Sequence, residues 1–329
     1  MGWSLISLQA TVAYLPFGST MDFNRWNTFW TVCYGVMAFI IILGNTLSIS
    51  VLLKRRLRKR PRFLLISLAM ADLLVGLFAI PIYIILFTVK TSWLIRLIYE
   101  CVDMLTGLSS IFTLAVISLE RLYATVRPLR HRQLNLSNYI IAIATPWILS
   151  LMVTSTRVLQ AFFIITAKQF LIVVIFSLST PLLISCIAYY IIWKKQASRI
   201  HNHVHVRNDA KLSRTLFLIT ALFVLSWLPF QVLLIVVSLC ISCRFHIFIL
   251  FVIKLLQYGN SFINFVIYCL RMPDYKNAVS QMLRCCKCNR NTNRLSRSQA
   301  SHSSGVALVS FTSSLFWYTV SDSTVKDVQ

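Results

Sequence analysis

Acidic residues are scarce in this chain. Its 329 residues hold 9 aspartates and glutamates against 32 lysines and arginines, a net charge of +23. Charged residues of both signs make up only 12% of the chain, about half of the quarter typical of soluble domains. Hydrophobic residues make up 57%. This combination excludes an ordinary soluble domain and predicts a membrane protein.

Long apolar runs occur seven times, each near the 20 residues that cross a bilayer core of ~30 Å. The sequence has no internal repeat of the kind that marks many transporters. It therefore predicts an all-α membrane protein with a seven-helix bundle. The predicted spans are Trp30–Leu53, Phe63–Thr88, Leu97–Tyr123, Tyr139–Leu159, Phe170–Trp193, Leu212–Leu239 and Phe245–Leu270.

The basic residues gather between the spans, on one side of the predicted bundle. Dense clusters follow the first, third, fifth and seventh spans, whereas the other side carries only scattered cations such as Lys90 and Arg157. Because positive loops stay in the cytosol, we expect the N-terminus outside and the C-terminus in the cytosol of a plasma-membrane protein. Topology and anionic lipid thus explain the charge better than nucleic acid does.

The predicted bundle, residues 30–270, lies between an extracellular tail, 1–29, and two cytosolic segments. Translation from Met21 instead of Met1 stays open. Residues 271–288 predict a short amphipathic eighth helix at the interface, with Tyr275 on its apolar face, and palmitoylation at Cys285, Cys286 and Cys288. A metal site at these cysteines is the rival interpretation. Residues 289–329 are rich in serine and threonine and predict a disordered cytoplasmic tail.

Ionisable residues inside the predicted spans are the best candidates for function, because a charge in hydrocarbon costs at least about 2.5 kcal/mol unless it faces the bundle interior. Asp72 lies in the middle of the second span. Asp103 and Glu120 lie in the outer part and at the inner end of the third. Each of these carboxylates needs a polar or cationic partner.

Motifs in the successive spans resemble those of the rhodopsin-like G protein-coupled receptors over nearly the whole chain. Each motif occupies the corresponding span at the corresponding depth. The matching residues are Gly44–Asn45, Leu68–Asp72, Glu120–Arg121, Trp147, Pro181 with Tyr189, Phe223 with Ser226–Pro229, and Asn264–Tyr268. The resemblance implies a receptor, not an enzyme, that binds an extracellular ligand and activates a heterotrimeric G protein. After phosphorylation of the tail, it implies arrestin as a second partner.

The resemblance also implies a switch at the cytosolic end. In the resting state Arg121 would pair with Glu120 and with Asp209 at the foot of the sixth span. When the sixth helix moves outward, Arg121 would join Tyr189 and Tyr268 in a cavity for the G protein. The packing switch beneath the ligand would involve Phe223, Trp227 and Asn264.

A sodium ion is the cofactor that the resemblance implies beneath the ligand pocket. Asp72 supplies a carboxylate, and oxygen ligands suit a hard cation. A water-filled polar network without an ion is the alternative. The surrounding residues by resemblance are Asn45, Ser110, Asn260, Ser261 and Asn264.

Asp103 lies five helical turns outward from Arg121, about 27 Å at 1.5 Å per residue. It resembles the acid that binds the ammonium of the ligand in biogenic amine receptors. Lys254, one turn outward of Tyr258, is the rival partner of Asp103. If they pair, the pocket would take a carboxylate-bearing, nucleoside, peptide or lipid ligand. The predicted ligand-binding residues are Asp103, Met104, Thr106, Ser177, Trp227, Phe230, Gln231, Lys254 and Tyr258.

The chain departs from the family pattern at several positions. Arg96 stands where the family has a disulfide cysteine, and Cys240 and Cys243 offer a local bridge that resembles adenosine and melanocortin receptors. Phe265 replaces the proline after Asn264. A receptor-like protein that has lost coupling is therefore one alternative, and a transporter or channel is another.

Overall fold

The computed structural model describes residues 20–53, 62–89, 91–201, 221–222, 225–236, 247–271, 275–277 and 279–280. In these ranges all regular structure is helical, as predicted. Six of the described helices are long and apolar enough to cross a membrane, and a shorter apolar helix, Leu225–Val236, lies within the predicted sixth span. The described helices follow one another in the order of the seven predicted spans.

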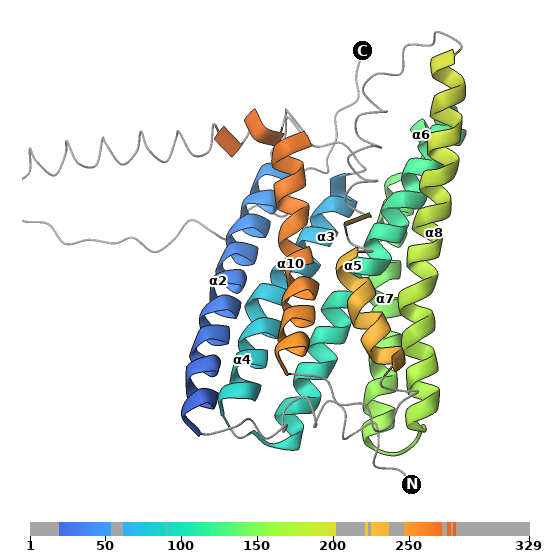
Figure 1. Ribbon diagram of the computed structural model, residues 1–329. Coiled ribbons are helices and arrows are strands. Elements are labelled where there is room, and N and C mark those ends of the chain that lie inside the picture. The colour runs from blue at the N-terminus through green and yellow to red at the C-terminus, as the bar shows by residue number, and fades with distance from the viewer. Residues whose placement is uncertain are drawn as a thin grey trace, which may run out of the picture. The chain divides into compact units, whose positions relative to one another are not determined.

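The helices begin and end within a few residues of the predicted spans, except that α2 already begins at Thr20 and α8 continues to His201 (Figure 1). The third starts at Trp93 because the Ser92 hydroxyl accepts the Ile95 amide at 3.5 Å and caps the first turn. The described helices are α2 (Thr20–Leu52), α3 (Arg62–Leu74), η2 (Val75–Ala79), α4 (Ile80–Thr88), α5 (Trp93–Val126), α6 (Pro128–Arg132), α7 (Leu136–Ala161), α8 (Ala167–His201) and α10 (Ile247–Arg271).

The second span is irregular at its centre, where α3 passes through the π-helical turn η2 into α4. Pro81 is the second residue after this turn. Proline has no amide hydrogen, and its ring clashes with the carbonyl four residues earlier in a regular helix. The wider π turn accommodates the proline without ending the span.

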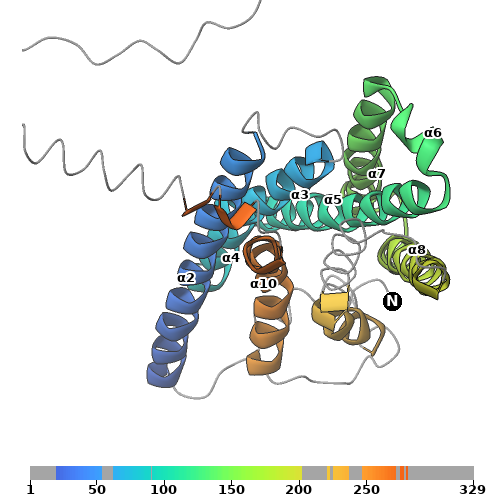
Figure 2. The ribbon, with the colours of Figure 1, turned by 90° about the horizontal axis from the view of Figure 1, so that it is seen from above.

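Helix α5 occupies the middle of the bundle and packs against α3, α7 and α8 (Figure 2). Its inner residues are small or hydroxylated, including Gly107, Ser109 and Ser110, so that neighbouring helices approach closely. Helices α7 and α8 are only 17% buried over their most apolar windows, and exposed Met152 and Phe176 lie on them. These outer surfaces face lipid in a membrane.

Phe265, where the family pattern has proline, packs against Gly44 of α2. A Cβ atom added to Gly44 would lie 3.0 Å from the ring of Phe265. Helix α10 runs without interruption through this position. Phe265 therefore fills the space beside Gly44, between α2 and α10. The seventh helix, α10, is unbroken at this position.

The predicted eighth helix is only partly described, at residues 275–277 and 279–280, which are helical. Tyr275 is 1% exposed and its hydroxyl donates to Ser48 Oγ at 2.7 Å. Burial raises the pKa of Tyr275 to about 12, so the phenol stays neutral. The predictions for Asp209, Phe223 and the cysteines at 240, 243, 285, 286 and 288 lie outside the described residues.

Candidate ligand pocket and coupling site

The outer half of the bundle holds an ion pair between α5 and α10. Lys254 Nζ lies 2.6 Å from Asp103 Oδ2, and both side chains are largely buried, at 11% and 14% exposed. Helical spacing brings Lys254 one turn outward of Tyr258, on the face that meets α5. The structure thus contains the internal pair between Asp103 and Lys254 that the sequence analysis gave as the alternative to an amine contact at Asp103.

Aromatic rings surround the ammonium of this lysine. Lys254 Nζ lies 4.9 Å from the ring centre of Tyr258 and 5.6 Å from those of Tyr99 and Phe230. The hydroxyls of Tyr99 and Tyr258 are 2.9 Å apart. The negative faces of such rings stabilise a cation that is removed from water. We call Tyr99, Phe230 and Tyr258 the aromatic cage.

Two other predicted pocket residues direct their hydroxyls to their own helices. Thr106 Oγ1 donates to Val102 O at 2.8 Å, and Ser177 Oγ donates to Val173 O at 2.6 Å. Met104 is partly buried. Gln231 Nε2 is buried with no hydrogen-bond partner among the described residues, so it retains capacity for a ligand.

Trp227 lies below the aromatic cage, edge-on to Phe230 at 5.9 Å between ring centres. The absence of a side chain at Gly107 makes room for it, because an added Cβ would lie 3.0 Å from Trp227 Cη2. A shift of this ring is therefore coupled directly to α5, which is the geometry that a packing switch requires.

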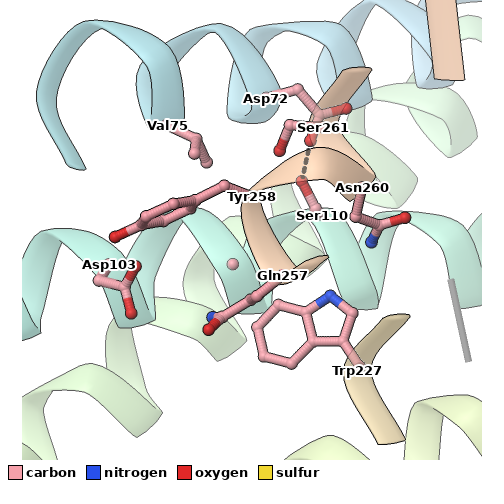
Figure 3. Close-up of a pocket in the computed structure, with 10 residues that line it drawn as sticks. Asp72, Val75, Asp103, Ser110, Trp227, Gln257, Tyr258, Asn260 and Ser261 are labelled. Carbon is pink, nitrogen blue, oxygen red and sulfur yellow. Dashed lines mark hydrogen bonds between the residues drawn. The ribbon is translucent and has the colours of Figure 1, made fainter. Parts of the chain in front are cut away.

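A narrow cavity joins the ligand region to the middle of the bundle. Figure 3 shows Asp103 and Tyr258 toward one end, Asp72 and Ser110 toward the other, and Gln257 and Trp227 along one side. The empty volume is about 280 Å³, but the part that the centre of a water molecule can reach is about 10 Å³. That is room for about one water molecule.

Asp72 is 1% exposed and accepts hydrogen bonds from two of its predicted neighbours. Ser110 Oγ donates to Oδ1 at 2.8 Å and Asn264 Nδ2 to Oδ2 at 2.7 Å. Asn45 Nδ2 donates to the Ser261 carbonyl at 2.9 Å. These residues, with the buried Asn260, form the polar core of the bundle.

The polar core retains acceptor capacity. The side-chain oxygens of Asn45 and Asn264 are buried and have no hydrogen-bond partner among the described residues. Buried polar groups in folded proteins are normally paired with protein or water. The open oxygen of Asn264, whose amide nitrogen donates to the Asp72 carboxylate, fits the donor set of a hard cation such as sodium, or a water molecule.

At the cytosolic end the predicted contact of Arg121 with Glu120 is present, with Arg121 Nε 2.5 Å from Glu120 Oε2. The structure adds His131, whose Nε2 lies 2.6 Å from Glu120 Oε1, and Tyr139, whose hydroxyl lies 3.4 Å from the same oxygen. Tyr189 is buried at 4% exposed, and the Tyr268 side chain lies outside the described residues.

Sequence reasoning missed a buried ion pair at the outer end of α5. Glu100 is 3% exposed, and its Oε2 accepts from Arg157 Nε at 2.6 Å and also contacts Arg157 Nη2. Arg157 also donates to Gln160 Oε1 at 2.5 Å. Arg157 had been placed among the scattered outer cations. The pair joins α5 to α7 at the level where the family disulfide is missing.

These features, a helical membrane bundle with ion pairs and a polar core in its interior, are typical of a membrane receptor. The family model described as 7 transmembrane receptor (rhodopsin family) matches residues 44–268. The chain belongs to this family. It is therefore a multi-pass membrane receptor that transmits the binding of an extracellular ligand to G proteins, and not an enzyme.

Named relatives differ in their ligands. The human histamine H2 receptor is 28% identical over 307 residues, covering 82% of this chain and 84% of that protein. The tyramine receptor Ser-2 of Caenorhabditis elegans is 32% identical over 130 residues, 38% of this chain and 29% of that one. The galanin receptor type 1 of Rattus norvegicus is 25% identical over 300 residues, 78% and 83% of the two chains.

Proposed function

We propose that the ligand is a small molecule with an amino group, whose ammonium binds Asp103 within the aromatic cage. One observation carries this proposal: an ammonium already lies there, because Lys254 Nζ is 2.6 Å from Asp103 and within 5.6 Å of three ring centres. A carboxylate with aromatic faces is a typical environment for binding amines. The ligand's ammonium takes the place of that of Lys254.

The names of two relatives agree with an amine, since one is a histamine receptor and another a tyramine receptor. The galanin receptor favours a peptide as the second candidate ligand class.

The test is a screen of histamine, tyramine and other primary amines on cells that express the receptor, with G protein activation as the readout. Asp103→Asn is expected to lower potency by roughly 30-fold or more, the effect of removing one partner of a desolvated charge pair. Asp103→Glu keeps the charge and serves as the matched control. Full potency in Asp103→Asn at equal surface expression would end the amine proposal.

Coupling to the G protein depends on Arg121 in this account. In the resting state Glu120 holds Arg121, and Asp209 supplies a second contact when the sixth helix is closed. An agonist favours the state in which that helix moves outward, and Arg121, Tyr189 and Tyr268 then contact the G protein. Asp209→Ala is expected to raise ligand-independent signalling, and unchanged basal activity at equal expression would contradict the role of Asp209.

Sodium binding at Asp72 is a further part of the proposal. The Asp72 carboxylate, the Ser110 hydroxyl and the open side-chain oxygens of Asn45 and Asn264 would hold the ion. Sodium would then stabilise the closed bundle and lower agonist affinity. Agonist affinity that is the same in sodium and in choline chloride would favour a water network instead.

The receptor's orientation and cytosolic contacts complete the proposal. The basic clusters support a C-terminus in the cytosol of a plasma-membrane protein, because positive loops stay on that side. Arrestin binds the phosphorylated serine-rich tail, and palmitoyl groups on Cys285, Cys286 and Cys288 attach residues 271–288 to lipid. Thioester-specific labelling tests the palmitoylation. A variant with serine in place of Cys285, Cys286 and Cys288 should lose the label that the wild type carries.

A further inference from the structure

The acid–lysine pair, Asp103 with Lys254, constrains the charge of the ligand. Both side chains are largely removed from water, and their charges compensate each other at 2.6 Å. A ligand that carries only an ammonium would displace Lys254 from Asp103 and leave the lysine charge buried. Removing one partner of a buried pair is strongly unfavourable because the other charge stays uncompensated.

The described surroundings give Lys254 no second anion. Its remaining polar contact there is with the neutral Gln257, whose Oε1 lies 3.1 Å from Nζ. Glu100, one turn outward of Asp103 on α5, is bound by Arg157 from α7. The aromatic cage cannot compensate either, because the incoming ammonium needs the same ring faces.

The ligand also needs space that the closed pair fills. Between Asp103 and Trp227 the cavity has room for about one water molecule. Lys254 has a flexible four-carbon stem and can withdraw along α10. Binding and opening of the acid–lysine pair are therefore one event.

We infer that the receptor recognises an amino-acid-like zwitterion, with the ammonium of the ligand on Asp103 and its carboxylate on Lys254. Such a ligand replaces one ion pair by two and leaves no buried charge uncompensated. In an α-amino acid both groups stand on one carbon, so a single small head group meets both residues. Its side chain then points toward Trp227. This inference rests on the proposed role of Asp103 as the amine acceptor.

Matched probes that differ in one charged group test the inference on the full-length receptor in cells. One set is histidine, histamine and imidazolepropionic acid, and the other is tyrosine, tyramine and hydroxyphenylpropionic acid. The remaining common amino acids and their decarboxylated amines extend the panel. G protein activation is read in the wild-type receptor and in Lys254→Met and Asp103→Asn, with surface levels measured by an N-terminal epitope tag.

We expect an amino acid to be at least roughly 30-fold more potent than its amine on the wild-type receptor. Lys254→Met should reverse that preference, because Asp103 then has no internal partner and the carboxylate has no acceptor. Asp103→Asn should lose both responses. If either single variant fails to reach the surface, Asp103→Asn/Lys254→Met removes both charges together, and it should respond to neither class.

Other outcomes separate this inference from the proposed function. An amine that is more potent than its amino acid, with a ratio unchanged in Lys254→Met, overturns the zwitterion and leaves the amine proposal intact. A carboxylate-only probe that is equally potent on wild-type and Asp103→Asn receptors overturns both. A panel that leaves the wild-type and Lys254→Met receptors silent also overturns the zwitterion.

Discussion

Breaking the ion pair between Glu100 and Arg157 should destabilise the receptor without touching the ligand pocket. Arg157→Met keeps an unbranched apolar stem but removes the guanidinium that binds the Glu100 carboxylate, which is 3% exposed. Loss of one partner from a buried pair costs about 3–5 kcal/mol. At roughly 2 °C per kcal/mol for a large domain, the melting temperature should fall by about 6–10 °C.

The assay is thermal unfolding of the detergent-solubilised receptor, followed by cysteine-reactive dye or by retention of binding. Glu100→Gln/Arg157→Met leaves no uncompensated charge and should recover most of the loss. Lys168→Met, which removes an exposed outer cation, is the matched control and should change the melting temperature little. A melting temperature of Arg157→Met within about 1 °C of wild type, or no recovery in the double variant, would refute the reasoning.

Two further substitutions act on signalling. Gly107→Ala places a methyl group 3.0 Å from Trp227 Cη2, so the ring must move by a few tenths of an ångström, and basal nucleotide exchange should change at equal expression. His131→Ala frees the Glu120 carboxylate to rotate away from Arg121, and because a hydrogen bond to a charged group contributes about 1.5 kcal/mol, basal activity should rise by up to about 10-fold.

Each has a control in the chain. Gly35→Ala also adds a methyl group to a helix, but nothing lies within 4 Å of its Cβ, and basal activity should stay as in the wild type. Arg132→Ala removes the exposed neighbour of His131. If Gly35→Ala shifts basal activity as much as Gly107→Ala does, the contact between residue 107 and Trp227 does not control the switch. If His131→Ala leaves basal activity unchanged, the contact between His131 and Glu120 does not control it.

The features predicted correctly from the sequence are those that a single helix or a fixed spacing determines. The apolar runs predicted the helices. The contact between Glu120 and Arg121 could be predicted because the two residues are adjacent in the chain. Lys254 was placed near Asp103 because helical periodicity puts it one turn outward of Tyr258. For Asp72, the family motif supplied Ser110 and Asn264, and both donate to its carboxylate.

Contacts between helices that no motif records could not be predicted. Arg157 and Glu100 are 57 residues apart on different helices, and neither position shows any pattern in the sequence. Nothing in the sequence marks Tyr99, whose ring centre lies 5.6 Å from the Lys254 ammonium. His131 lies in a short connecting helix, whose direction depends on packing.

The central claim is that an amine at Asp103 and a G protein at Arg121 are linked through one helix bundle. Amine-stimulated nucleotide exchange on a purified G protein, measured with membranes that carry wild-type, Asp103→Asn or Arg121→Ala receptor, tests it most directly. We predict stimulation by a compound bearing an ammonium in the wild type, and its loss in both variants. Stimulation that survives in Asp103→Asn or in Arg121→Ala would contradict the account.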